Sequence, residues 1–151
     1  MQLTRMTDYA LRLLIYVAGH PDRLCTIAEV AAAYDISQAH LMKITHQLGL
    51  EGWVETVRGK GGGIRLARRP REINLGAVMR STESDFHLVP CFVADSTCPL
   101  TGNCGLADVV EGALQAFQSH INRFTLADVL KSTSPARMQW KPISGPRKRA
   151  T

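Results

Sequence analysis

The stretch from Thr26 to Leu66 reads TIAEVAAAYDISQAHLMKITHQLGLEGWVETVRGKGGGIRL, and its pattern decides the fold. It begins with Thr-Ile-Ala-Glu, a capping box in which the threonine and the glutamate satisfy free backbone N–H groups at the start of a helix. This alanine-rich helix is expected to end near Tyr34, and Ser37 is a suitable N-cap for the next helix. The residues expected to be buried in that next helix share one face: Leu41, Ile44 and Leu48, with Thr45 beside them.

A hairpin and an earlier helix complete the pattern. Residues 53–57 and 64–67 read as two strands around the glycine-rich turn 59–63. Upstream, residues 7–18 place their apolar side chains on one helical stripe. The order of helix, helix, short turn, helix and hairpin predicts a winged helix-turn-helix over residues 1–80, so the expected fold class is mainly α with a small β-hairpin wing.

The third helix of a winged helix-turn-helix enters the major groove of DNA, where its solvent-facing side chains touch base edges. The predicted contacts on this helix are donors without a carboxylate among them: Ser37, Gln38, His40, Lys43 and Gln47. Arg58 precedes the glycine-rich turn and Lys60 lies within it. Cations at this place increase the affinity for DNA, because they release counterions from its phosphates. The alternative is a polar stripe that is simply solvated, but the basic hairpin tip favours binding to double-stranded DNA.

Net charge and the length of the apolar stretches indicate the kind of partner and the location of the protein less specifically. The 151 residues carry a net charge of +5, which is compatible with a nucleic-acid partner without establishing one. The longest apolar stretch near the N-terminus, residues 13–18, is too short to span a bilayer and reads as an amphipathic helix rather than a secretory leader. We therefore expect a cytoplasmic protein with no membrane partner.

The C-terminal half supplies an association element. Apolar side chains keep helical spacing over about five turns after residue 105: Leu106, Val109, Val110, Ala113, Leu114, Phe117, Ile121 and Phe124. This stripe is too long for the small domain to cover, so we expect the same helix of a second subunit to pack against it in a homodimer. Residues 106–131 would hold this helix and a short final one, and the basic tail 132–151 is expected to be disordered.

Three cysteines lie close together in the loop 81–105. Six residues separate Cys91 from Cys98, and five separate Cys98 from Cys104. The tight pairing of structural zinc sites is missing, and the wide spacing suits a loop that wraps an iron–sulfur cluster. Three unligated thiols on a flexible loop are the alternative, although they would be open to oxidation without benefit. Cys25 stands alone and reads as a small buried hydrophobe.

Ligand chemistry alone does not identify the fourth ligand of such a cluster. Solvent, a small molecule or a side chain could fill the position. The candidate side chains are Asp8, Glu83, Asp85, His87 and Asp95. His87 is the default by proximity, whereas a carboxylate would be a labile ligand of the kind that a sensor requires.

Four segments resemble the iron–sulfur winged-helix regulators, a family that contains the NsrR, IscR and RirA proteins. They are residues 1–12 (MQLTRMTDYALR), residues 57–66 (VRGKGGGIRL), the three loop cysteines and residues 124–128 (FTLAD). Within that family the chain is most similar to the nitric-oxide-sensing NsrR repressors. The resemblance runs from residue 1 to about 131 and leaves out the basic tail.

The resemblance implies a homodimer that holds one iron–sulfur cluster per subunit on Cys91, Cys98 and Cys104, with 4Fe–4S favoured over 2Fe–2S. Asp8 matches the aspartate that completes the cluster from the other subunit in some relatives, so the resemblance prefers it over His87. It also implies a repressor that binds operator DNA, with Arg58 as the leading contact. Nitric oxide would attack the cluster and release the repressor from genes of nitric oxide detoxification.

Two departures keep an iron-responsive, RirA-like regulator open as the alternative. The gap between Cys91 and Cys98 is one residue longer than the common five, and the pattern from Thr82 to Phe86 is similar to that of RirA. IscR is disfavoured because its histidine is replaced here by Ala107. An iron–sulfur electron carrier and a zinc-stabilised DNA-binding protein are lesser alternatives. No nucleotide-binding fingerprint or catalytic dyad is found, so an enzyme is not expected.

Overall fold

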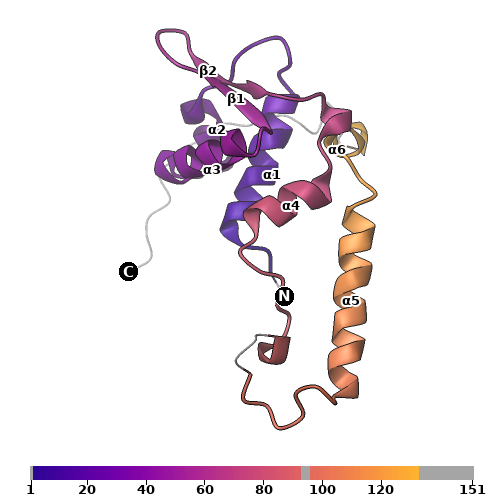
Figure 1. Cartoon of the computed structure of the whole chain (residues 1–151). Coiled ribbons are helices and arrows are strands. Elements are labelled where there is room, and N and C mark those ends of the chain that lie inside the picture. The colour runs from indigo at the N-terminus through magenta and orange to yellow at the C-terminus, as the bar shows by residue number, and fades with distance from the viewer. Residues whose placement is uncertain (1, 93–95, 133–151) are drawn as a thin grey trace.

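The computed structural model of the chain describes residues 2–92 and 96–132 (Figure 1). In chain order its elements are α1 (Arg5–Ala18), α2 (Ile27–Tyr34), α3 (Gln38–Leu50), β1 (Val54–Val57), β2 (Gly63–Leu66), the 3-10 helix η1 (Pro70–Glu72), α4 (Leu75–Thr82), the 3-10 helix η2 (Pro90–Phe92), α5 (Gly105–Ile121) and α6 (Leu126–Ser132). The predicted order of elements and the mainly helical fold class are confirmed. The basic tail, apart from Ser132, lies outside the described residues.

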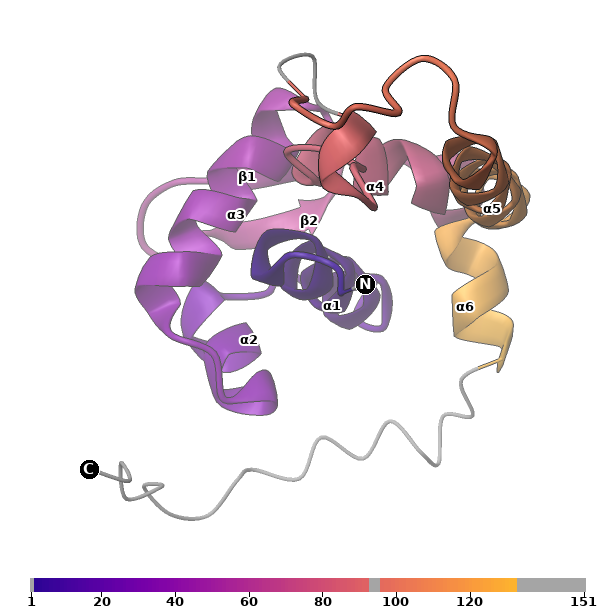
Figure 2. The ribbon, with the colours of Figure 1, turned by 90° about the horizontal axis from the view of Figure 1, so that it is seen from below.

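Helix α1 lies at the centre of the N-terminal domain, and Figure 2 shows it surrounded by α2, α3, the hairpin, α4 and α6. The helix buries its apolar stripe: Ala10, Leu13, Leu14 and Val17. It begins at Arg5, two residues before the start that the apolar pattern predicts. The reason is a cap, because the Thr4 hydroxyl accepts a hydrogen bond from the N–H of Thr7 (3.3 Å).

Helices α2 and α3 form the helix-turn-helix, and the end of α2 and the start of α3 lie where the sequence predicts. Asp35 closes α2 in the left-handed conformation, with φ of 55°. The Ser37 hydroxyl then accepts a hydrogen bond from the N–H of His40 (3.2 Å) and caps α3. The four residues of α3 predicted to be buried are so: Leu41, Ile44, Thr45 and Leu48.

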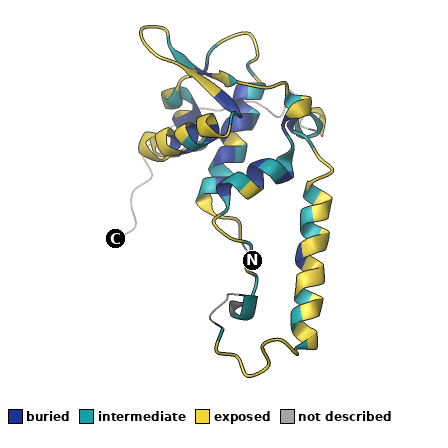
Figure 3. Ribbon diagram, viewed as in Figure 1, coloured by how far each residue is buried: buried dark blue, intermediate teal, exposed yellow. Residues whose placement is uncertain are grey.

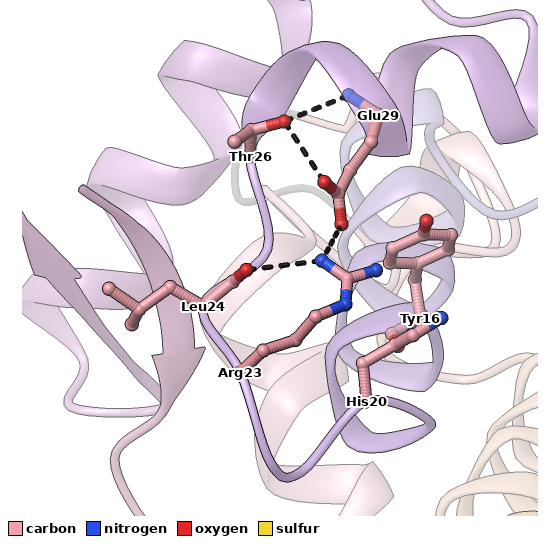
Figure 4. Close-up of polar contacts among 6 residues, drawn as sticks. All are labelled: Tyr16, His20, Arg23, Leu24, Thr26 and Glu29. Atoms are coloured by element: carbon pink, nitrogen blue, oxygen red, sulfur yellow. Dashed lines mark hydrogen bonds and ion pairs between the residues drawn. The ribbon is translucent and has the colours of Figure 1, made fainter. Parts of the chain in front are cut away.

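A clamp of polar side chains holds the loop before α2, as Figure 4 shows. The Thr26 hydroxyl accepts a hydrogen bond from the N–H of Glu29 (3.2 Å), which confirms the predicted N-cap. The Glu29 carboxylate accepts hydrogen bonds from the Thr26 hydroxyl (3.2 Å) and from the Arg23 guanidinium (2.6 Å). Arg23 also donates to the carbonyl of Leu24 (3.1 Å), so a single guanidinium fixes the loop against the first turn of α2.

The hairpin is fastened to this loop. The backbone of Cys25 exchanges two hydrogen bonds with Ile64 of β2 (2.9 and 2.7 Å), so an isolated antiparallel β-bridge joins the loop to the hairpin. A Cβ on Gly63 would lie 2.7 Å from the carbonyl oxygen of Cys25, so glycine is required for this approach. Strand β1 begins one residue later than predicted, because the N–H of Trp53 bonds the carbonyl of Leu48 at the end of α3 (2.9 Å).

Helix α5 runs away from this domain, and α6 returns to it (Figure 1). Leu126 of α6 is fully buried, and its N–H bonds the carbonyl of Ile73 (2.9 Å). By contrast, α5 buries only Leu114, and Figure 3 shows the helix largely exposed along its length. Leu106 and Val109 are each 69% exposed, so much of the predicted apolar stripe has no cover within the described chain. None of the described helices is long and apolar enough to cross a membrane.

The clamp predicts a pH-dependent loss of stability. Burial raises the pKa of Glu29, but the hydrogen bonds from Arg23 and Thr26 outweigh it, and the pKa lies below its ordinary value. Such a carboxyl contributes stability above the unfolded pKa of about 4.3, and the contribution is lost as the pH falls through the folded value. Glu29→Gln should therefore lower the free energy of unfolding by about 0.5–1 kcal/mol at neutral pH. Urea unfolding should show the difference shrinking below pH about 4.

Glu111→Gln is the matched control, because Glu111 is exposed on α5 and has no ion pair among the described residues. That variant should follow the wild type at every pH. A Glu29→Gln defect of the same size at neutral and acidic pH would contradict the role given to the ionised carboxylate.

Candidate nucleic-acid interface and cysteine loop

The predicted contacts of α3 lie at the surface of the domain. Ser37, Gln38, His40 and Lys43 are exposed, and Gln47 is half-buried. Gln47 has an intrahelical partner that the sequence did not suggest, because its side-chain amide donates to the carboxylate of Glu51 (3.3 Å). Gln38 and Lys43 have no side-chain hydrogen bond or ion pair among the described residues, whereas the Ser37 hydroxyl caps α3 and the His40 ring centroid lies 6.4 Å from that of Tyr9.

A second exposed ridge of α3 includes residues that the sequence did not single out. Ala39, Met42, His46 and Leu50 follow one another at helical spacing and are all exposed. Met42 is 60% exposed and Leu50 is 71% exposed, which is unusual for large apolar side chains. Their spacing was visible in the sequence, but apolar residues were considered only as candidates for the core.

Two neighbouring arginines of the hairpin region are already occupied. Arg65 of β2 donates two hydrogen bonds to the carboxylate of Glu55 on β1 (3.0 and 2.9 Å). The guanidinium of Arg68 lies over the ring of Trp53, 4.7 Å from its centroid. These contacts stabilise the hairpin, so the two cations are less available to an anionic partner.

The hairpin tip and the adjacent face of α3 carry available cations instead. Among residues 2–92 and 96–132, no carboxylate forms an ion pair with Lys43, Arg58 or Lys60. Gly59 and Gly61 hold positive φ angles (100° and 80°) that fold the turn carrying Arg58 and Lys60 outward.

Helix α1 contributes to the same side of the molecule. A groove of about 170 Å³ lies between α1 and α3, lined by Arg5, Met6, Tyr9, His40, Lys43 and Ile44. Arg5, like Lys43, has no ion pair within the described chain. Arg5 was not predicted as a contact, because it lies before the apolar stripe that indicates α1 in the sequence.

The three loop cysteines lie on the segment that joins α4 to α5. All three are free thiols; Cys98 is exposed, and Cys91 and Cys104 are half-buried. The carbonyl of Cys98 accepts hydrogen bonds from the Thr101 hydroxyl (2.7 Å) and the Thr101 N–H (3.0 Å), which sets a tight turn. Cys104 is the N-cap residue of α5, with no hydrogen bond from its side chain to the helix.

A single chain does not gather the cysteines and Asp8 into one site. Within the described residues, no group of three or more histidine, cysteine, aspartate or glutamate side chains is placed to hold a metal ion. Asp8 lies on α1, where its carboxylate pairs with Arg12 of the next turn at 3.0 Å. Any site that joins all four residues therefore needs a rearranged loop, a second subunit or both.

The other candidate ligands differ in availability. Glu83 accepts the N–H of Thr4 (2.9 Å), and Asp85 accepts the N–H of His87 (3.2 Å). His87 is half exposed, with its Nδ1 atom 3.7 Å from an Asp85 carboxylate oxygen. Asp95 lies outside the described residues.

Cys25 has the environment predicted for it. Its side chain is fully buried beneath the hairpin. Burial, together with the nearby Glu29 carboxylate, raises the pKa of Cys25 to about 11. The thiol is therefore protonated at neutral pH and packs as an apolar side chain.

A helix-turn-helix with a basic hairpin at its edge defines a winged-helix, DNA-binding protein. The chain belongs to the Rrf2 family, whose model, described as "Iron-dependent Transcriptional regulator", matches residues 3–132. It is therefore a transcriptional regulator and not an enzyme, as the sequence predicted.

The similar proteins agree with this assignment. The transcriptional regulator NsrR of Bacillus subtilis is 46% identical over 134 residues, which cover 87% of this chain and 92% of that protein. NsrR of Halalkalibacterium halodurans is 48% identical over 132 residues, covering 86% and 90%. The solved structure of T. potens IscR shares the fold, with a TM-score of 0.73, 24% identity and coverage of 91% and 92%. The resemblance to NsrR found in the sequence is thus confirmed.

The available and occupied cations of the hairpin should differ in their effect on DNA binding. Arg58→Ala should weaken binding and lower the slope of log affinity against log salt by about one unit for each Arg58 that contacts a phosphate. Fluorescence anisotropy with duplex operator DNA at several salt concentrations measures both quantities.

Two variants serve as controls for this titration. Exchanging both Glu55 and Arg65 for glutamine removes a neutral pair and should leave the slope unchanged. Met42→Ala removes no charge, so any loss of affinity should come without a change of slope. An unchanged slope for Arg58→Ala would show that Arg58 does not contact a phosphate.

Proposed function

We propose that this chain is a homodimeric transcriptional repressor that carries an iron–sulfur cluster on its cysteine loop and leaves its operator when nitric oxide reacts with that cluster. Genes of nitric oxide detoxification would then be expressed. The observation that carries the proposal is the set of three free, partly accessible cysteines on one loop between the DNA-binding domain and α5. It is supported by relatives named NsrR that are 42–48% identical over most of the chain.

Cys91, Cys98 and Cys104 would hold the cluster, one per subunit, as 4Fe–4S in preference to 2Fe–2S. Soft thiolates are suitable donors for such a cluster. Cys104 lies at the N-cap of the 17-residue helix α5, whose positive end favours a negatively charged ligand. The cluster, when bound, supplies iron that reacts with nitric oxide. The loop must draw its thiols together to hold it, and the turns at Cys98 and Cys104 provide local order for that closure.

Asp8 of the second subunit is the fourth ligand that we propose. Its side chain is 42% exposed, and its pair with Arg12 is solvent-accessible. Exposed pairs of this kind contribute at most about 1 kcal/mol, so exchanging Arg12 for a metal costs little. A carboxylate is a harder donor than a thiolate and is therefore the ligand most readily displaced. Glu83 is less suitable because its carboxylate is engaged by the N–H of Thr4.

DNA binding would use α3 and the hairpin together. The exposed face of α3 presents Ser37, Gln38, His40 and Lys43, with Gln47 at its edge, to the major groove. Arg58 and Lys60 would contact the backbone or the minor groove beside it. Met42, which is 60% exposed on α3, would meet the thymine methyl group, which is the one apolar feature of the major groove.

The dimer would form through α5. Leu106 and Val109 of the predicted apolar stripe are each 69% exposed, and these side chains would be removed from water by the α5 helix of a second chain. The same association would bring Asp8 of one subunit toward the cysteine loop of the other.

An iron-responsive regulator is the second candidate. It is favoured by the description of the family as iron-dependent and by the pattern from Thr82 to Phe86. In that case loss of iron from the loop, and not nitric oxide, would release the DNA.

An anaerobic gel-shift titration separates the two. One arm adds nitric oxide to the cluster-loaded dimer on operator DNA, and the other adds an iron chelator. We expect DNA release at a few nitric oxide molecules per cluster and retained binding with chelator. Binding that survives nitric oxide would refute the nitric oxide proposal, and release by chelator alone would favour the iron-responsive regulator.

A charge introduced into the apolar stripe of α5 tests whether this helix forms the dimer contact. Val109→Glu should convert the dimer to a monomer, because an unpaired carboxylate would be buried in the apolar contact. Ser119→Glu adds the same charge at an exposed position of α5 outside the predicted apolar stripe and should stay dimeric. Sedimentation equilibrium reads the mass of each variant. A dimeric Val109→Glu variant would place the interface elsewhere.

A further inference from the structure

Two buried hydroxyls join the cysteine loop to the central helix. The hydroxyls of Thr7 on α1 and Thr82 on α4 lie 2.9 Å apart, although 75 residues separate them in the sequence. Thr7 is fully buried and Thr82 is 8% exposed. Thr82 is the last residue of α4, so the cysteine loop begins immediately after it. Thr7 directly precedes Asp8.

The Thr82 hydroxyl also lies within hydrogen-bond distance of backbone carbonyls of its own helix. The Thr82 hydroxyl has one proton, which it donates to the carbonyl of Val78 (3.0 Å) or of Met79 (3.3 Å). With its proton used in this way, the Thr82 oxygen can accept the proton of the Thr7 hydroxyl. The Thr7 oxygen can then accept from the Thr4 hydroxyl, 3.3 Å away. Each hydroxyl thus depends on the placement of the next.

A second contact reinforces the first at the point where the loop leaves α4. The N–H of Thr4 donates to the carboxylate of Glu83 (2.9 Å). Glu83 is the C-cap of α4, and its own N–H bonds the carbonyl of Met79 (2.8 Å). The first residue of the loop is therefore tied to the residue that caps α1.

The surroundings leave this junction room to move. A groove of about 430 Å³ lies beside it, lined by Gln2, Leu3, Thr4, residues 83–88, Leu114 and Phe117. If the loop shifts toward or away from α5, Glu83 moves with it, and the Thr4 amide loses or regains its acceptor. Hydrogen bonds between Thr7 and Thr82 require the two hydroxyls to keep a particular relative position. Two apolar side chains would fill the same space without that requirement.

We propose that Thr4, Thr7, Thr82 and Glu83 form a latch that transmits the state of the cysteine loop to α1, and through α1 to the DNA-binding face. Thr7 and Thr82 act as positioning residues in this proposal, because both are buried and neither is among the predicted DNA contacts or cluster ligands. The latch rests on the proposed function, because it needs a loop whose state depends on a cluster. It holds α1 in one placement when the loop is ordered and releases α1 when the loop is not.

The test is the ratio of operator affinity with and without the cluster, measured by anaerobic anisotropy on the full-length protein. In the wild type, the cluster should raise operator affinity about 5- to 150-fold, which is the usual size of an allosteric coupling. Thr82→Val should bind the cluster normally, as judged by iron and sulfide content, and should reduce this ratio at least fivefold. Thr82→Ser keeps the hydroxyl and should restore the ratio. Thr7→Val should act like Thr82→Val, and the double variant should go no further.

Thr45→Val is the matched control. The hydroxyl of Thr45 is buried on α3 and has no hydrogen-bond partner within the described chain. The same substitution there removes a buried hydroxyl outside the latch, so the affinity ratio should remain at the wild-type value.

The possible failures are distinguishable. A wild-type ratio near one would refute the proposed function, and the latch with it. A large wild-type ratio that survives in Thr82→Val and Thr7→Val would refute the latch alone. Loss of the cluster from Thr82→Val would also overturn the latch, because it would place Thr82 in cluster binding and not in transmission.

Discussion

The burial of α1 on several sides is the constraint on which the other elements depend. This helix packs against α2, α3, α4, α6 and β2, so the recognition helix, the hairpin and the start of the cysteine loop share one support. Its core side chains cannot shift without disturbing several contacts, because protein interiors are close-packed. A change that moves α1 as a body would therefore reach the DNA-binding face.

Local signals explain why the sequence predicted most of the fold. The caps at Thr26 and Ser37 and the buried face of α3 each depend on residues within a few positions of one another. The start of α1 was missed because its cap, Thr4, lies outside the apolar stripe. The pairing of Cys25 with Ile64 was also missed, since no local pattern marks a contact across 39 residues.

The functional site was predictable only in part. Cysteine spacing identified the loop, but spacing cannot tell where the thiols lie relative to Asp8, which depends on packing between segments far apart. Met42 was overlooked because a large apolar residue is ordinarily assigned to the core. The Thr7–Thr82 contact was equally hidden, since single threonines 75 residues apart carry no pattern.

Hydrogen–deuterium exchange of the cluster-loaded and cluster-free dimers, both without DNA, tests the central claim that the loop controls α1. Cluster removal should speed exchange at the amides of residues 4–8 as well as in the loop 83–104, because the Thr4 and Thr7 amides belong to the latch. Faster exchange confined to the loop, with residues 4–8 unchanged, would contradict that claim.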